Sequence, residues 1–341
     1  MRALRYLLAY TVPATVAISF TSTGWLCYLP LLYSFGIIPL LDQVVGAIRG
    51  NLGGHERAKA SKDRMYDLVI YLALPLQLFM LSWFLIAVQE PMSTADLVGR
   101  ITAMGMMCGV LGVNVAHELG HRTKRYERIM AKVLLASSLY MHFYIEHNKG
   151  HHRNVGTSID GATARRNELV YLFWMRTLVH SFLSAWQITV KELRRKKVRI
   201  FSIHNEMLVM LFVQFFFCVA LAWGFSMHVL MCFLSAALMG ILLLETVNYI
   251  EHYGLYRNKV SEFRFEDVQP EHSWNSDHAL GRLVLFELTR HSDHHWEPSK
   301  HYQVLNSLQG ELQLPAGYPA MMLLSLFPPA WFRVMNPKLP K

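Results

Sequence analysis

Charged residues and paired cysteines are scarce in this sequence. Asp, Glu, Lys and Arg make up 17% of the 341 residues, while 53% are hydrophobic, and soluble domains contain roughly 25% charged residues. The four cysteines lie in apolar runs and none forms a C-x-x-C pair, which argues against a disulfide framework and against an iron–sulfur module of the chain's own. The composition indicates an integral membrane protein.

Six apolar stretches are long enough to cross a bilayer. Each has about 17–23 residues, and because a helix rises about 1.5 Å per residue, each crosses a hydrocarbon core of about 30 Å. They lie near residues 5–23, 25–45, 67–88, 97–116, 206–226 and 228–247. We therefore expect an all-α integral membrane protein with six transmembrane helices.

The basic residues predict the orientation of these helices. The turns after spans one, three and five contain no Lys or Arg, whereas the loop after span two and the segment between spans four and five are rich in both. Because basic loops stay in the cytoplasm, both termini and the long loops are predicted to be cytoplasmic. We expect one domain over residues 1–341, with a helical cytoplasmic insert at 117–205 and a cytoplasmic tail at 248–341.

Histidine is abundant, with 17 copies, and nine of them form four groups on the predicted cytoplasmic side. The groups are His117 and His121; His147, His151 and His152; His252; and His291, His294 and His295. Spacings of three and four residues stack imidazoles on one face of a helix. Because clustered ionisable groups are costly near a bilayer, their convergence indicates a metal site.

The number of imidazoles bears on the number of metal ions. A catalytic zinc ion uses three protein ligands, so nine imidazoles are too many for one such site. Divided between two ions, they supply four or five nitrogens each and leave room for a small molecule. Imidazole suits zinc, copper and iron alike, but the ligand count favours a redox-active di-iron centre carried by a helical cytoplasmic cap.

The stretch HELGH at residues 117–121 also matches the H-E-x-x-H motif of zinc peptidases, in which the glutamate, here Glu118, is the general base. Other carboxylates beside the clustered histidines are Glu146, Glu251 and Asp293. A carboxylate that accepts the second ring N–H fixes the orientation of a metal-bound imidazole. That role explains all four carboxylates, whereas a peptidase explains one. A peptidase and a non-enzymatic metal-binding protein stay open as alternatives.

At these groups the chain resembles the membrane-bound alkane 1-monooxygenases of the histidine-box superfamily of fatty-acid desaturases and hydroxylases. The segments that carry the resemblance are HELGHR, EHNKGHH, NYIEHYGL and RHSDHHWEPSKHYQVL, with HSWNSD at 272–277 as a further signature. NYIEHYG is the most discriminating, since desaturases generally lack it. The resemblance implies that the nine histidines named above bind two irons.

The resemblance also implies an activity. It implies O2-dependent hydroxylation of the terminal methyl of medium-chain n-alkanes to 1-alkanols, with electrons from NADH through a reductase and a rubredoxin. It implies a multi-pass protein of the bacterial inner membrane with its active site on the cytoplasmic side. Another methyl-bearing hydrophobe, an alkylbenzene or a fatty acyl chain, is the alternative substrate. Membrane lipids are expected partners and nucleic acids are not.

Four polar residues outside the histidine groups are predicted to support the ligands by hydrogen bonds. Asp160 keeps the place that it has in the family, and the other three are chosen by position alone: Asn248, His272 and Asn275. In this family a bulky side chain in the second span can limit the chain length of the substrate. Tyr33 or Phe35 is the expected residue here.

The densest basic run, KELRRKKVR at residues 191–199, has two interpretations. It can anchor the cytoplasmic side to anionic lipid headgroups, or it can dock an acidic electron donor. The two roles are compatible, and the sequence does not choose between them.

Overall fold

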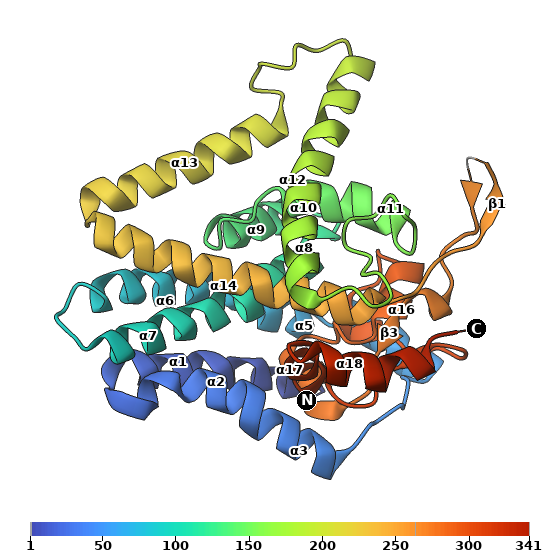
Figure 1. Ribbon diagram of the computed structural model, residues 1–341, viewed down its shortest axis with the longest axis horizontal. Helices are drawn as coiled ribbons and strands as arrows, with labels where there is room; N and C mark the ends of the chain where they lie inside the picture. The colour runs from blue at the N-terminus through green and yellow to red at the C-terminus, as the bar shows by residue number, and fades with distance from the viewer. Residues whose placement is uncertain (1, 263, 341) are drawn as a thin grey trace.

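The computed structural model describes residues 2–262 and 264–340 (Figure 1). Within these residues, six helical segments are long and apolar enough to cross a membrane. They are Arg2–Thr21, Gly24–Val45, Arg64–Ala87, Thr94–Gly120, Glu206–Gly224 and Met227–His252. These segments confirm the six predicted spans with ends shifted by a few residues, and they define a multi-pass membrane protein.

The first four spans are composites of shorter helices, whereas the last two are single α-helices. The elements are η1 (Arg2–Tyr10) and α1 (Thr11–Thr21); η2 (Gly24–Tyr28), α2 (Leu29–Leu32), η3 (Tyr33–Ile37) and α3 (Ile38–Val45); α5 (Arg64–Tyr71) and α6 (Ala73–Ala87); α7 (Thr94–Met107), η4 (Cys108–Val113) and α8 (Asn114–Gly120); α13 (Glu206–Gly224); and α14 (Met227–His252). η3 and η4 are π-helical. π-helical turns inside α-helices are frequent at functional sites, because they re-aim the side chains that follow.

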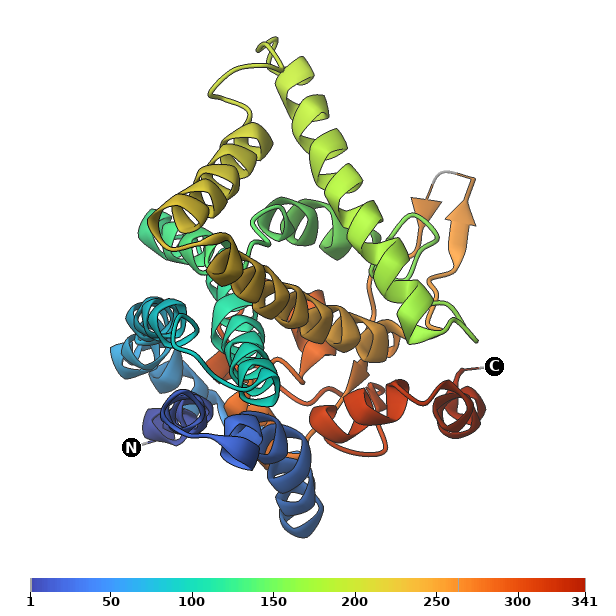
Figure 2. The same ribbon diagram turned by 60° about the vertical axis from the view of Figure 1, so that its left-hand side comes forward.

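The segment between spans four and five is helical for most of its length. It contains α9 (Arg125–Ala136), α10 (Phe143–Glu146), η5 (His147–His151), α11 (His152–Asn154) and α12 (Val170–Arg195). Residues 155–169 contain neither helix nor strand, with positive φ angles of 71° at Gly156 and 63° at Asn167. In Figures 1 and 2, α12 and α13 diverge from the loop that joins them.

Short elements make up the tail after α14, and α4 (Gly54–Lys62) lies in the loop after span two. The tail contains β1 (Lys259–Ser261), β2 (Arg264–Phe265), η6 (Pro270–His272), β3 (Trp274–Asn275), α15 (Ala279–Val284), α16 (His291–Trp296), η7 (Tyr302–Val304), β4 (Leu312–Gln313), α17 (Tyr318–Ser325), α18 (Pro328–Met335) and η8 (Asn336–Lys338). β1 pairs antiparallel with β2, and β3 pairs parallel with β4. Strands of two or three residues add little sheet, so the fold is all-α as predicted.

Small residues bring the fourth and sixth spans into close contact. A Cβ on Gly240 of α14 would lie 2.4 Å from the Cβ of Cys108 in η4, and one on Gly105 of α7 would lie 2.6 Å from the sulfur of Met239. Small residues allow helix backbones to approach closely in a membrane, where packing drives helix association. This contact fixes the two spans that carry His117, His121 and His252 relative to each other.

A buried carboxylate joins the second span to the tail. Asp42 of α3 is fully buried, and it accepts hydrogen bonds from the backbone N–H groups of Leu280, at 2.7 Å, and Gly281, at 3.1 Å. These are orphan donors in the first turn of α15, which an acidic side chain satisfies and stabilises. The tail is thereby held against the membrane-spanning helices, beneath which the histidines gather.

Candidate metal centre

All nine clustered histidines converge into two adjacent groups. The five-histidine group contains His117, His121, His147, His152 and His294. The four-histidine group contains His151, His252, His291 and His295. Within each group, one ring nitrogen from every residue lies within 4.8 Å of all the others. The eight histidines outside the predicted set belong to neither group.

The π-helical turn η5 explains how the second histidine box serves both groups. On an α-helix, residues four apart share a face, which would pair His147 with His151. A π-helix has more residues in each turn, so that residues five apart share a face instead. His147 accordingly lies beside His152, with 3.0 Å between their Nε2 atoms, whereas His151 turns toward His295, with 3.2 Å between theirs.

The spacing of the ring nitrogens fits metal coordination. In the five-histidine group, neighbouring Nε2 atoms are 3.1 Å apart for His147 and His121 and 3.1 Å apart for His294 and His152. Two nitrogens about 2.1 Å from one ion and at right angles to each other are about 3.0 Å apart. The Nε2 atom of His117 is buried without a hydrogen-bond partner among the described residues, and a metal ion would satisfy it. These imidazoles could therefore hold a metal ion.

Burial keeps most of these imidazoles in the form that binds metal. It lowers the pKa of His121 to about 3, and with repulsion from neighbouring imidazoles it lowers the pKa values of His147, His152 and His294 well below the usual value. Neutral imidazole is the metal ligand, so no proton has to leave before an ion binds. His151 differs: burial opposes its charged form, but the carboxylate of Asp160 raises its pKa.

Two of the carboxylates predicted to support the ligands touch a clustered histidine. Asp160 Oδ2 lies 3.0 Å from Nδ1 of His151 and accepts a hydrogen bond of 2.6 Å from the Thr163 hydroxyl. Glu251 Oε2 lies 3.2 Å from Nε2 of His291, the ring nitrogen that also faces His252. Asp160 is thus placed to orient His151 through Nδ1, the ring nitrogen that faces away from the other histidines. Glu251 instead contacts Nε2 of His291, the nitrogen that would face an ion.

Glu118 has other partners. Its Oε1 is 2.7 Å from Nη2 of Arg122 and accepts a hydrogen bond of 3.1 Å from the backbone N–H of Tyr302. A carboxylate bound in this way is poorly placed to take a proton from a water molecule, so Glu118 does not have the position of a peptidase's general base. Glu118 instead joins the end of span four to the tail.

Among the described residues, two further predicted supports contact the chain around α16 and not a ring nitrogen. Asp293 pairs with Lys300 at 2.7 Å and accepts from the backbone N–H of Asn306. Asn275 accepts a hydrogen bond of 2.8 Å from the backbone N–H of Ser292, and thus anchors α16.

Within residues 2–262 and 264–340, the side chains of three other predicted supports form no hydrogen bond or ion pair with a clustered histidine. His272 bonds to the backbone N–H of Gln269. Asn248 donates to Glu245 at 3.1 Å. Glu146 is buried, and burial together with the nearby Asp160 raises its pKa to about 8. Glu146 ends α10 directly before His147, and Asn248 lies on α14 one helical turn before His252.

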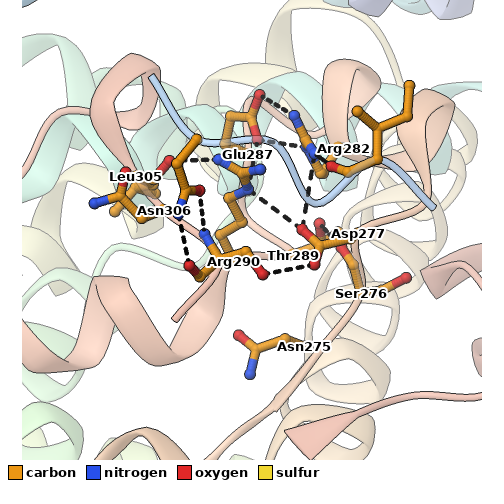
Figure 3. A network of polar contacts seen from close by, with 12 residues as sticks. Asn275, Ser276, Asp277, Arg282, Glu287, Thr289, Arg290, Leu305 and Asn306 are labelled. Carbon is orange, nitrogen blue, oxygen red and sulfur yellow. Dashed lines mark hydrogen bonds and ion pairs between the residues drawn. The ribbon is translucent and has the colours of Figure 1, made fainter. Parts of the chain in front are cut away.

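A buried ion network that sequence reasoning missed lies directly before the last histidine box (Figure 3). Arg290 Nε is 3.4 Å from Asp277 Oδ1 and 3.5 Å from Glu287 Oε2, and Arg282 Nε is 2.7 Å from Glu287 Oε2. Arg290 also donates to the backbone carbonyl of Leu305 at 2.6 Å. The signal in the sequence was four charged residues within the fourteen positions 277–290, where most of the other residues are apolar.

An apolar cavity lies beside the histidine groups. It measures about 60 Å³ and is lined from spans two, four and six, from α15 and from α17. A groove of about 680 Å³ continues it toward the surface between spans two and six. Phe35, Leu243 and Met322 line both spaces. The described lining of the cavity includes Asn114, one helical turn before His117, and Val247, five residues before His252, but none of the nine clustered histidines.

Comparison with known proteins shows which protein family has this sequence and architecture. The sequence profile of the fatty acid desaturase family matches residues 95–324. The alkane 1-monooxygenase of Ectopseudomonas oleovorans is 38% identical over 343 residues, which cover 98% of this chain and 84% of the relative. That of Pseudomonas putida is 38% identical over 336 residues, covering 96% and 83%. The xylene/toluene monooxygenase hydroxylase component XylM of Pseudomonas putida is 28% identical over 349 residues, covering 99% and 89%.

Six spans, two histidine groups and the desaturase profile together define a membrane-bound oxidoreductase of the histidine-rich kind. Within that class, the chain belongs to the alkane 1-monooxygenase family. It is accordingly a monooxygenase, as the histidine segments predicted.

Proposed function

We propose that this enzyme hydroxylates the terminal methyl of medium-chain n-alkanes at a di-iron centre. The reaction consumes one hydrocarbon, one O2, two protons and two electrons, and yields one 1-alkanol and one water. The observation that supports it is the convergence of nine imidazoles in two groups beside a cavity lined almost wholly by apolar side chains. The proposal places the enzyme in the bacterial inner membrane with the histidine groups on the cytoplasmic side.

Under this proposal the nine histidines hold two irons, with five imidazoles on one ion and four on the other. The irons would supply the activation of O2, which side chains cannot perform. The polypeptide supplies position and surroundings. Asp160 orients His151, and apolar walls exclude water from the place where the methyl group arrives.

The shape of the cavity favours a straight hydrocarbon entering end first. A long apolar molecule concentrates in lipid, and the open groove between spans two and six lies among lipid-facing residues such as Leu32 and Leu238. The inner cavity is small, at about 60 Å³, which suits the end of an unbranched chain better than a branched end. A fatty acyl chain is less suited, because neither the described lining of the cavity nor that of the groove contains a charged residue to meet a carboxylate.

A methyl group on an aromatic ring is the second candidate substrate. It is favoured by the similarity to XylM, whose name refers to xylene and toluene. Expression of the chain with a rubredoxin and an NADH-dependent rubredoxin reductase, supplied with n-alkanes of graded length and with xylenes, would distinguish the two. We expect 1-alkanols by mass spectrometry, and benzylic alcohols without 1-alkanols would overturn the assignment.

Two histidines on α14 provide a matched test of the metal centre. His252 ends the helix in the four-histidine group, whereas His228 lies exposed near its first residue. We expect His252→Ala to abolish hydroxylation and to lower the iron content from two ions per chain, measured by plasma mass spectrometry. His228→Ala should leave both unchanged. One zinc per chain in the active wild type would contradict the proposal.

A further inference from the structure

A basic cleft opens near the second histidine box. It measures about 900 Å³ and lies between the turn η5–α11, the helix α12 and the hairpin β1–β2. Its walls include six basic side chains: Lys149, Arg153, Lys191, Arg195, Arg257 and Arg264. Two carboxylates, Glu192 and Asp267, also line it, which leaves a net charge of +4.

Few of these cations are neutralised. Lys149 pairs with Glu192 at 2.9 Å, and Arg264 lies 3.9 Å from Asp267. Arg153, Lys191 and Arg195 are absent from the ion pairs of residues 2–262 and 264–340. A concave surface lined by one sign of charge concentrates its field and attracts partners of the opposite sign.

Arg257 gives the cleft a fixed shape. Its guanidinium donates to the backbone carbonyl of Glu266 at 2.7 Å and to that of Arg153 at 3.0 Å. The hairpin β1–β2 is thereby fastened to α11. The cleft is formed by segments more than one hundred residues apart in the sequence, which is why no single basic run identified it.

The wall of the cleft is continuous with both histidine groups. Arg153 directly follows His152, one of the two partly exposed members of the five-histidine group. On the other side, the backbone carbonyl of Thr157 accepts a hydrogen bond of 3.2 Å from Asp160, which contacts His151 at 3.0 Å. Electrons tunnel best along short bonded paths. A peptide bond connects the wall of the cleft to His152 of the five-histidine group, and two hydrogen bonds through Asp160 connect it to His151 of the four-histidine group.

The cleft also offers apolar contact. Ile159 is 58% exposed, and Ile188 and Phe265 line the same space. Protein interfaces commonly combine an apolar centre with a polar rim. A small anion such as inorganic phosphate would leave these side chains unused, whereas a protein surface would cover them.

We propose that this cleft docks the acidic face of a soluble one-electron carrier, an inference that rests on the proposed function. Each turnover needs two electrons, so two reduced carriers are oxidised in succession while one hydrocarbon, one O2 and two protons become one alcohol and one water. The docking surface divides the basic run of residues 191–199. Lys191 and Arg195 belong to the cleft, whereas Lys196, Lys197 and Arg199 lie outside it.

This division of the basic run allows two triple variants to be compared, each of which removes three positive charges. The cleft variant carries Lys191→Gln, Arg195→Gln and Arg264→Gln; the control carries Lys196→Gln, Lys197→Gln and Arg199→Gln. All six side chains are exposed. Both variants would be placed with the wild type in nanodiscs of zwitterionic phosphatidylcholine, and a purified acidic rubredoxin would serve as the carrier.

We expect the cleft variant to raise the rubredoxin concentration for half-maximal hydroxylation by about tenfold at low salt, with the rate at saturating rubredoxin unchanged. The control should change it less than twofold, and 0.5 M salt should remove the difference. Equal shifts in the two variants, or none in either, would overturn the cleft as the docking surface.

Direct binding separates this inference from the proposed function. Surface plasmon resonance with rubredoxin reports docking without any turnover. Binding that depends on the cleft, together with no alcohol from any hydrocarbon, would defeat the proposed function and leave the docking surface standing. A cleft variant that loses only its affinity for phosphatidylglycerol vesicles would show a lipid site and defeat the docking inference.

Discussion

His151 has a different environment from its neighbour His152. Within the described residues, its Nδ1 faces the carboxylate of Asp160, while the Nδ1 of His152 is buried without a partner. A carboxylate on the far nitrogen of a ligand fixes the ring orientation and raises the basicity of the other nitrogen. The four-histidine group therefore contains one imidazole that is held in place before an ion binds.

This contact predicts the effect of Asp160→Asn. Residue 160 would keep its shape and lose its charge, so we expect metal affinity at the four-histidine group to fall by about 10–100-fold. Titration of the metal-free protein with Fe(II) under anaerobic conditions would measure it. Asp267→Asn is the control, because Asp267 is an exposed carboxylate whose side chain is 83% accessible. Equal affinity in the Asp160 variant and the wild type would mean that the contact does not orient His151.

At the scale of the helices, the position of the site depends on the contact between η4 and α14. This contact holds together the spans that carry His117 and His252, and the close approach occurs at a glycine. Closely packed interiors tolerate added atoms poorly, because neighbouring side chains must leave their preferred rotamers.

Gly240→Leu should therefore disrupt the site from a distance. Its first added carbon would lie 2.4 Å from the Cβ of Cys108, so the helices must separate. We expect a loss of at least about 1–3 kcal/mol in stability, visible as a lower midpoint of thermal unfolding, and iron content should fall with it. Gly224→Leu, at the end of α13, has no heavy atom within 4 Å of its added Cβ and is the control. Unchanged unfolding of the Gly240 variant would show that the helices are not in contact there.

The helices also show what sequence reasoning could and could not reach. Hydropathy located the six spans because apolar length is a local property of the chain. The nine histidines were identifiable because their spacing is local too. Their division into five and four was not, since it depends on the π-helical turn at His147–His151. The network around Arg290 was missed for a similar reason: it closes only when Asp277, Glu287 and Leu305 meet in space.

The molecule as a whole brings three environments to one place. Lipid-facing helices supply an apolar groove, the ends of the spans supply the imidazoles, and the cap and tail supply a basic cleft. A hydrocarbon and an electron carrier could thus reach the centre from different sides without competing. Separate access explains why a membrane enzyme would pair a narrow apolar cavity with a wide polar cleft.

The path of the hydrocarbon can be tested at the junction of its two spaces. Phe35 lines both the cavity and the groove, whereas the hydroxyl of Tyr33 lies 2.8 Å from Thr11 Oγ1, against the first span. Removing the ring of the partly buried Phe35 should widen the junction, because a Phe→Ala change at a packed position leaves space that its neighbours fill only in part. We expect Phe35→Ala to shift hydroxylation toward longer n-alkanes by several carbons, as measured by competition among alkanes of graded length. Tyr33→Phe keeps its ring and should leave the profile of products unchanged. A Phe35→Ala enzyme with the profile of the wild type would place the limit on chain length elsewhere along the path.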